Sequence, residues 1–235
     1  MRKILLGLIG ANGRMGQEIM RQLDQRFELK VSCASVQDSR EELFCKADVV
    51  IDFSVKEIFE ENWQLANSHK KPLVVGTTSI TIPQKELKAP IFISPNMSLA
   101  VGFLSHITQQ MASLFSFDIE ITEAHHAGKI DAPSGTALML GQRASQGRGI
   151  AFNSLLDRSG IRPKEGIGFS VIRGGALPGE HTVHFIGEYE RLSFSHVCYS
   201  RAVFAKGALD IAEWMMDKEP GVYGMEHYLK EKLNV

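Results

Sequence analysis

The chain has 235 residues, of which 44% are apolar and 23% are charged, and its formal net charge is −1. These values are typical of a globular protein with a substantial core in one or two domains. The near-neutral charge disfavours nucleic-acid binding, which depends on clustered positive charge. No stretch is long and apolar enough to span a membrane. The three cysteines show neither paired zinc spacing nor an even count for disulfides, so we expect a cytoplasmic protein.

The N-terminal part of the chain alternates strands and helices around a glycine-rich turn. An apolar strand over residues 3–9 leads into Gly10-Ala-Asn-Gly-Arg-Met-Gly16, followed by a helix over 17–23 and a strand over 29–35. This order is the context in which a dinucleotide-binding fingerprint is meaningful. The spacing is Gly-x-x-Gly-x-x-Gly, so Asn12 replaces the usual middle glycine. We therefore predict that the turn binds a dinucleotide cofactor.

The choice of dinucleotide depends on the end of the second strand. The acidic residue that usually holds the ribose hydroxyl is not at its expected place there, since the strand ends Ala34-Ser-Val-Gln-Asp38. Asp38 comes slightly late and has Arg40 beside it. Arg14, inside the glycine turn, is an alternative contact for a ribose phosphate. The sequence leaves NADH and NADPH open and slightly favours NADPH.

The alternation continues with strands over 47–53, 71–78 and 89–94 and a helix over 56–69. Such alternation predicts a parallel sheet whose ligand crevice lies beyond the carboxyl ends of the strands. The turns Asp52-Phe-Ser54, Gly76-Thr-Thr78 and Pro95-Asn96 all fall on that edge. Each turn alone is typical of an ordinary loop, and together they favour a cofactor site.

The second half of the chain changes character after a long helix predicted over 99–115. The apolar stripe of this helix, which indicates core packing, consists of Leu99, Phe103, Ile107, Met111 and Leu114. Strands then follow one another with few intervening helices, which indicates a second, mixed or antiparallel sheet. These strands are expected over 117–123, 167–173, 181–187 and 190–199. The chain returns to helix over 202–216 and again near its C-terminus.

Fifteen residues from Glu123 to Ala137 concentrate titratable groups where the strand over 117–123 meets a helix that begins near residue 135. They read Glu-Ala-His-His-Ala-Gly-Lys-Ile-Asp-Ala-Pro-Ser-Gly-Thr-Ala. Helix-start N–H groups bind anions, Lys129 adds a cation, and histidines carry protons near neutral pH. The cluster therefore favours a carboxylate-bearing substrate that undergoes proton transfer. In the alternative interpretation, Asp131-Ala-Pro-Ser is an ordinary turn and cap, and the histidines are a strand end or metal ligands without a visible third.

Several residues outside this cluster have simpler interpretations. His181, His184 and His196 are predicted to be structural or surface residues, because their spacing specifies no metal site. Phe204 is predicted to pack in the core. Arg201 is either a solvated charge at a strand end or a second clamp for a carboxylate.

Together these motifs resemble the 4-hydroxy-tetrahydrodipicolinate reductase (dihydrodipicolinate reductase) family of the diaminopimelate–lysine pathway. The matching motifs span nearly the whole chain and are Gly10–Gly16, Asp52–Ser54, Gly76–Thr78, Glu123–Ala137, Arg173-x-Gly175, Gly179-Glu-His181-x-Val183 and Ser200-Arg-x-x-Phe-Ala-x-Gly-Ala208. The resemblance implies NADPH- or NADH-dependent reduction of 4-hydroxy-tetrahydrodipicolinate to tetrahydrodipicolinate. Two rival functions are a redox-sensing binding protein, whose basic nucleic-acid helix we do not find, and an oxidoreductase for another carbonyl or imine.

The resemblance also implies an architecture and roles for individual residues. It implies a Rossmann-like doubly wound parallel sheet domain over 1–96 and 205–235, and a smaller α+β domain with a mixed sheet over 97–204. The smaller domain would bind the substrate and form the contacts of a homotetramer. His125 would donate the proton and Lys129 would stabilise the developing charge. The substrate carboxylates would be held by His126, Lys129, Ser134, Gly135 and Thr136.

The cofactor site implied by the resemblance is lined by Gly10, Gly13, Arg14, Met15, Gly16, Gly76, Thr78 and Asn96. Two departures from the family pattern bear on cofactor preference. Val36-Gln37 stand where the family has its acidic residue, and the segment that precedes Asp48 is short. No metal is implied.

Overall fold

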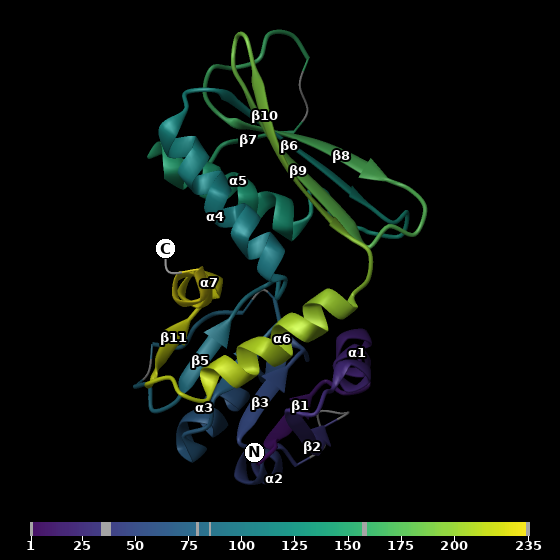
Figure 1. The fold of residues 1–235 in the computed structure, drawn as a ribbon, viewed down its shortest axis with the longest axis vertical. Helices are drawn as coiled ribbons and strands as arrows, with labels where there is room; N and C mark the ends of the chain where they lie inside the picture. Colours follow the sequence, from purple (N-terminus) through teal and green to yellow (C-terminus); the bar gives the residue numbers. More distant parts are fainter. Residues whose placement is uncertain (1, 34–38, 79, 85, 157–158, 234–235) are drawn as a thin grey trace. The chain divides into compact units, whose positions relative to one another are not determined.

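The computed structural model describes residues 2–33, 39–78, 80–84, 86–156 and 159–233. These residues form two compact units (Figure 1). One unit combines Met1–Leu99 with Arg201–Val235, and the other consists of Ala100–Ser200. Each unit has its own sheet.

The first unit is built on a six-stranded sheet in which every pair of neighbouring strands is parallel. Its strands are β1 (Ile4–Ile9), β2 (Phe27–Cys33), β3 (Val49–Asp52), β4 (Leu73–Val75), β5 (Pro90–Ile93) and β11 (Gly221–Tyr223). They lie in the order β11-β5-β4-β3-β1-β2, so the winding direction reverses between β1 and β3. In parallel sheets this reversal point is where ligands bind, beyond the carboxyl ends of the strands.

Helices cover both faces of this sheet, and the strands are apolar because they are buried on both sides. On one face α1 (Arg14–Gln22), α6 (Ala202–Met215) and α7 (Met225–Leu233) share a core with the strands. On the other face lie α2 (Arg40–Lys46), the 3₁₀ helix η1 (Lys56–Ile58) and α3 (Phe59–His69). In β3, Ile51 joins the first core and Val50 the second. The predicted doubly wound sheet is confirmed.

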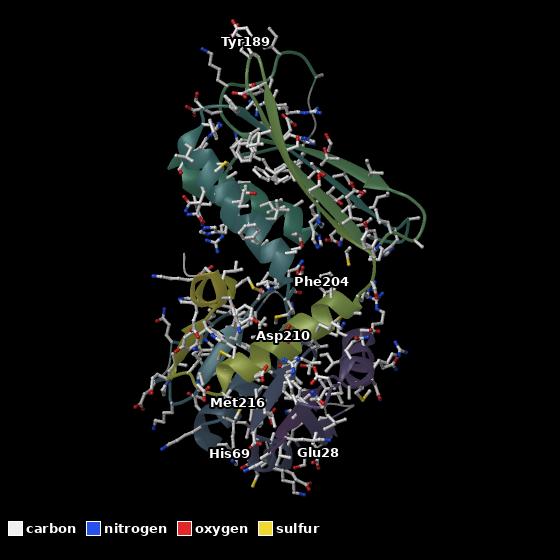
Figure 2. The ribbon with its side chains drawn as sticks, in the orientation of Figure 1. Glu28, His69, Tyr189, Phe204, Asp210 and Met216 are labelled. Atoms are coloured by element: carbon white, nitrogen blue, oxygen red, sulfur yellow. The ribbon has the colours of Figure 1, made fainter. Side chains whose placement is uncertain are left out.

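The second unit contains a five-stranded mixed sheet in the order β10-β9-β6-β8-β7. Its strands are β6 (Asp118–His125), β7 (Ser154–Leu155), β8 (Ile167–Arg173), β9 (Gly179–Ile186) and β10 (Arg191–Cys198). β6 is parallel to β8 and antiparallel to β9. The hairpin that joins β9 to β10 carries Tyr189 at its tip (Figure 2). The predicted mixed sheet of an α+β unit is therefore confirmed.

One face of this second sheet is covered by α4 (Leu99–Leu114) and α5 (Gly135–Arg148), which lie beside each other in Figure 1. Ile119 and Ile121 of β6 face these helices and pack with Phe185 of β9. Because side chains alternate along a strand, Glu123 and His125 continue the same covered row. The sheet thus carries two titratable side chains into a buried position at the end of its core.

The apolar stripe predicted on α4 is confirmed at Met111, which packs against the core, and is wrong at three other positions. Leu99, Phe103 and Leu114 are 42%, 43% and 69% exposed. The helix instead buries a row that contains small residues: Val101, Gly102, Leu104, Ser105, Thr108 and Ala112. The physical reason is close contact with α5, where a side chain on Gly147 would meet the backbone of Gln109 at 2.1 Å. Small residues allow this approach, whereas larger apolar ones would prevent it.

Other boundaries differ from the sequence prediction in ways that affect the site. α1 begins at Arg14 instead of residue 17, so the last residues of the glycine turn are its first helical turn. β6 extends to His125, which places this histidine on the strand and not on the following loop. The elements α2, β7 and β11 were not predicted. Phe204, near the start of α6 (Figure 2), packs against the core of the first unit as predicted.

Candidate active site

The glycine turn of the first unit connects β1 to α1 and leaves no room for side chains at two positions. Gly10 has a φ of +83°, and a Cβ there would lie 2.5 Å from the carbonyl oxygen of Phe53. A Cβ at Gly16 would lie 2.2 Å from the carbonyl oxygen of Gly10. The turn is therefore folded against itself and against the end of β3.

Gly13 caps α1 without a side chain that could accept a hydrogen bond from the first turn of the helix. The N–H groups of Arg14, Met15 and Gly16 thus open a helix whose positive end has no built-in anion. This arrangement suits a phosphate, because backbone donors and the helix dipole both favour negative charge there. Gly10, Gly13 and Gly16 together form a cradle that fits the pyrophosphate of a dinucleotide.

The ends of β3 and β4 meet the glycine turn through Phe53. The N–H of Phe53 donates to the carbonyl of Ile9, and the N–H of Gly76 donates to the carbonyl of Asp52. A Cβ at Gly76 would lie 2.1 Å from the ring of Phe53. Gly76 is therefore required by the packing of this aromatic ring, and the three strand ends form one continuous edge.

Two further predicted residues follow β4 and β5 on the same edge. Thr78 is exposed, and its neighbour Thr77 has a buried hydroxyl oxygen without a hydrogen-bond partner. Asn96 accepts the N–H of Ser98 at 2.9 Å through its side-chain oxygen. The orphaned hydroxyl of Thr77 is a polar group that a bound ligand can satisfy, which fits a cofactor along this edge.

The residues considered for distinguishing NADPH from NADH are Arg14, Arg40 and Asp38. Arg14 is exposed at the start of α1. Arg40 is buried in α2 and forms an ion pair with Glu61 of α3. Asp38 and Val36-Gln37 lie outside the described residues. Of the two arginines considered, Arg14 therefore has the freer guanidinium for a ribose phosphate.

In the second unit, the carboxylate of Glu123 is the centre of a buried polar network. Its side chain is fully buried. Oε2 accepts from Nδ1 of His125 at 2.6 Å and from Arg173 at 2.8 Å. Oε1 accepts from the N–H of Ser134 at 2.9 Å and from Arg173 at 2.7 Å. Burial opposes ionisation, but the bonds from Arg173, His125 and Ser134 outweigh it and lower the pKa of Glu123.

His125 is the last residue of β6 and is 8% exposed. Its Nδ1 binds Glu123, which leaves Nε2 for another partner. A Cβ at Gly179 of β9 would lie 3.0 Å from this Nε2. Burial lowers the pKa of His125, Glu123 opposes this effect, and the nearby cations Lys129 and Arg173 lower the pKa further. The imidazole is therefore mostly neutral near pH 7.

A second imidazole, His181 of β9, lies edge-on to His125 with ring centroids 5.1 Å apart. Its Nε2 is 2.9 Å from the hydroxyl oxygen of Ser134, and its Nδ1 is buried without a hydrogen-bond partner. Burial and the nearby His125 lower the pKa of His181 to about 4. His181 is therefore a neutral neighbour of His125 over most of the physiological pH range.

Ser134 is the N-cap of α5, and both its backbone N–H and its hydroxyl have hydrogen-bond partners. Its hydroxyl oxygen accepts the N–H of Ala137 at 3.1 Å, as an N-cap does. A Cβ on the next residue, Gly135, would have no heavy atom within 4 Å, so the space at the start of α5 is open. Gly135 and the half-buried Thr136 form the first turn of this helix. The geometry suits a carboxylate, because backbone N–H groups and the helix dipole favour negative charge there.

The turn between β6 and α5 carries the remaining predicted residues. The N–H of His126 donates to the carbonyl of Leu177 at 2.8 Å, which fixes the turn next to the β8–β9 connection. Lys129 places its Nζ 2.7 and 2.8 Å from the carboxylate oxygens of Asp131. The bonds from Lys129 lower the pKa of Asp131. The second unit therefore collects His125, His126, Lys129 and the start of α5 on one stretch of chain.

Comparison with known proteins decides the family. A model described as dihydrodipicolinate reductase, N-terminus, matches residues 4–97, and one described as dihydrodipicolinate reductase, C-terminus, matches residues 97–229. The chain belongs to the dihydrodipicolinate reductase family. The predicted family and its oxidoreductase class are confirmed by these matches and by curated relatives.

The relatives match over nearly their whole length. The 4-hydroxy-tetrahydrodipicolinate reductase of Zymomonas mobilis subsp. mobilis is 39% identical over 248 residues, which cover 96% of this chain and 97% of the relative. That of Campylobacter lari is also 39% identical, with 96% and 99% coverage. The solved dipicolinate-bound dihydrodipicolinate reductase of Paenisporosarcina sp. TG-14 shares the fold, with a TM-score of 0.80 at 24% identity and coverage of 96% and 99%.

Sequence reasoning assigned no catalytic or binding role to three residues of the buried network, although they belong to the family motifs. These residues are Glu123, Arg173 and His181. The prediction that His181 is structural or at the surface missed its contacts with His125 and Ser134. The alternation of β6 offered a signal, because Ile119, Ile121, Glu123 and His125 share one face. Nothing in the sequence showed that Arg173 reaches this face from β8.

No group of three or more His, Cys, Asp or Glu side chains among the described residues is arranged to hold a metal ion. No helix in the part of the chain that the structure describes is long and apolar enough to cross a membrane.

Proposed function

We propose that this chain reduces 4-hydroxy-tetrahydrodipicolinate to tetrahydrodipicolinate with NADPH or NADH, in diaminopimelate and lysine biosynthesis. The observation that carries the proposal is the imidazole of His125, which is bound through Nδ1 to Glu123 just before a turn with Lys129 and the start of α5. The reaction consumes one hydride and one proton, and the substrate hydroxyl leaves as water. Relatives at 39% identity bear the name of this activity.

His125 is proposed to deliver the proton from Nε2, since Nδ1 is bound to Glu123. In the free protein its pKa is lowered by burial and by Lys129 and Arg173. A substrate with two carboxylates adds negative charge near the ring, which favours the imidazolium form. Substrate binding therefore supplies the condition under which His125 becomes a proton donor.

The substrate carboxylates are proposed to bind His126, Lys129, the Ser134 hydroxyl, Gly135 and Thr136. The N–H of Ser134 is already bound to Glu123, so Ser134 contributes through its hydroxyl. Lys129 stabilises negative charge that develops on the ring during reduction. The solved Paenisporosarcina reductase binds dipicolinate, a cyclic dicarboxylate, which makes dipicolinate a suitable probe for this chain.

The cofactor is proposed to bind the first unit along the carboxyl edge of its sheet. The helix-start N–H groups of Arg14, Met15 and Gly16 would hold the pyrophosphate above Gly10 and Gly13, and Gly76, Thr78 and Asn96 would line the remaining edge. When bound, the nicotinamide supplies the hydride, and the chain orients it. We propose that Arg14 contacts a ribose phosphate, which favours NADPH slightly over NADH.

We further propose a homotetramer assembled through the second unit. The face of the five-stranded sheet opposite α4 and α5 carries side chains that bind one another across the strands, including Thr182 with Ser195 and His184 with Ser193, both at 2.9 Å. Ile172 on the same sheet is 55% exposed. Light scattering after size exclusion tests this, with four times the chain mass of 26.1 kDa expected. We also propose a cytoplasmic location, since the odd number and wide spacing of the three cysteines in the sequence disfavour a disulfide framework.

The activity is tested by following substrate-dependent loss of nicotinamide absorbance with NADPH and NADH. His125→Ala is expected to lower kcat by ~10²–10⁴-fold, the usual range for a lost proton donor. Lys129→Ala is expected to lower kcat by ~10²–10³-fold, the range for a lost group that stabilises developing charge. Cofactor affinity is expected to stay unchanged in both variants. Lys164→Ala, on an exposed residue of the same unit, serves as the control. Normal turnover by both variants would contradict the assigned roles, and a wild-type chain that never consumes nicotinamide would contradict the function.

A further inference from the structure

We propose that Glu123 is a positioning residue that links the proton donor His125 to the carboxylate-binding start of α5. The inference rests on the proposed function and adds a residue that acts through others. One carboxylate holds His125 with its proton on Nδ1 and, at the same time, fixes the N-cap of α5 through the N–H of Ser134. Glu123 itself is buried and is not assigned a contact with substrate or cofactor.

The contacts of Glu123 use both oxygens in full. Oε2 is shared by His125 and Arg173, and Oε1 is shared by Ser134 and Arg173. The guanidinium also donates to the carbonyl of Asp131, within the turn that carries Lys129. A buried carboxylate is stable only when it is paired and hydrogen-bonded, and here Arg173 provides the pairing. The network therefore links the two ends of the substrate-binding turn.

The charges around His125 show what Glu123 contributes. His125 faces Glu123 on β6, Arg173 from β8, His181 from β9 and Lys129 from the turn. Glu123 is the only anion among these four. If its charge were removed, Arg173, the Lys129 ammonium with its partner Asp131, and a neutral imidazole would remain, and the imidazolium form would be disfavoured. Glu123 is thus the group that allows a buried histidine between two cations to take up a proton.

Glu123→Gln separates this role from a purely structural one. The variant keeps the side-chain length, and its amide oxygen can still accept the N–H of Ser134. Its NH₂ group, however, would lie against Nδ1 of His125 and would favour the tautomer with the proton on Nε2. A neutral imidazole in this form is a poor acid, because donation would leave an imidazolate.

The first measurement is the pH profile of kcat. For the wild type, kcat is expected to fall as pH rises through the pKa of His125 in the substrate complex. In Glu123→Gln this descending limb is expected to move down by ~1 pH unit or more, which lowers kcat at pH 7.5 by ~10-fold or more. Glu120→Gln is the matched control, since Glu120 is also on β6 and is also paired with an arginine, Arg162. Its profile is expected to match the wild type.

The second measurement does not require turnover. Calorimetry of dipicolinate binding in buffers with different ionisation enthalpies gives the number of protons taken up by the complex. The wild type and Glu120→Gln are expected to take up a proton near pH 7.5, and Glu123→Gln is expected to take up almost none. An inactive wild type would count against the proposed function, whereas this uptake would still test the role of Glu123.

Two results would overturn the inference. One is a Glu123→Gln variant that is less stable but keeps the wild-type pH profile and proton uptake, as a purely structural residue would. If that variant does not fold, Arg173→Gln decides, because it removes a cation while Glu123 remains. In Arg173→Gln, the descending limb of the kcat profile is expected to move to higher pH. A limb at the wild-type pH or at lower pH would be the second contradicting result.

Discussion

Two histidines on the same sheet face differ because their hydrogen-bond partners differ. His125 donates from Nδ1 to a carboxylate, whereas His181 is bound to the hydroxyl of Ser134 and has a pKa of about 4. We assign the proton of neutral His181 to Nε2, since a proton on Nδ1 would leave a buried donor without a partner. Ser134 then accepts from both His181 and Ala137, and its own hydroxyl proton is left to point at a ligand.

This assignment predicts the effect of replacing His181. His181→Phe removes the bond that orients the Ser134 hydroxyl, and the affinity for dipicolinate is expected to fall by ~3–10-fold, as for the loss of one hydrogen bond. His184→Phe is the matched control, because His184 is on the same strand and binds Ser193 on the opposite face. Calorimetric titration measures both affinities. Equal losses in the two variants would mean that the bond has no specific role in binding.

At the scale of elements, the candidate residues of each unit are placed by a helix that begins beside a strand end of that unit. α1 starts with no side-chain cap at Gly13, and α5 starts with a cap at Ser134 that already serves Ala137. The first arrangement suits a diphosphate that spans several N–H groups. The second suits a smaller carboxylate beside the open position of Gly135.

The start of α1 predicts a contrast between two glycines. Gly16→Ala would place a methyl group 2.2 Å from the carbonyl of Gly10, so the turn must shift, and affinity for NADPH is expected to fall ~100-fold or more. Gly13→Ala meets that oxygen only at 3.2 Å and is expected to have a smaller effect. Fluorescence titration with NADPH gives both values. Dipicolinate affinity is expected to stay unchanged in both variants, and a loss there would indicate general unfolding.

Much of this architecture could be predicted from sequence patterns, and the exceptions have physical causes. The glycine turn, the strands of the first sheet and the stretch from Glu123 to Ala137 are local patterns, so they are readable along the chain. The contacts of Arg173 and His181 with this stretch are not local, because they depend on the register of β8 and β9 against β6. On α4, the prediction was wrong at Leu99, Phe103 and Leu114 because the helix buries a different face, whose small residues allow close contact with α5.

For the whole molecule, buried histidines couple stability to pH. Burial lowers the pKa of His125, His181, His184 and His196 below the ordinary value of 6.5. In the unfolded chain these groups take up protons as pH falls through that value, whereas in the folded chain they resist until lower pH. Their contribution to stability is therefore fully present above pH 6.5 and is lost as pH falls toward the folded pKa, which is about 4 for His181.

Urea unfolding at pH 7.5, 6.0 and 5.0 is expected to show this loss. The free energy of unfolding should fall by up to ~1.4 kcal/mol per pH unit for each histidine that only the unfolded state protonates. His181→Gln should have a shallower slope between pH 6.5 and 4 than the wild type, because its largest contributor is gone. A wild-type stability that stays constant or rises over this interval would contradict the burial of neutral histidines.

Before any ligand arrives, the ammonium of Lys129 is paired with the carboxylate of Asp131 at 2.7 and 2.8 Å. An incoming anion must displace Asp131 from Lys129. Its net gain in binding free energy is therefore only the difference between its own interaction with Lys129 and that of Asp131. A compound with an amide or ester in that place cannot compete with Asp131 and receives no help from Lys129. If Lys129 binds a substrate carboxylate as proposed, the turn would distinguish ligands by charge, and a mono-amide of a suitable diacid would bind more weakly even though it fills the same space.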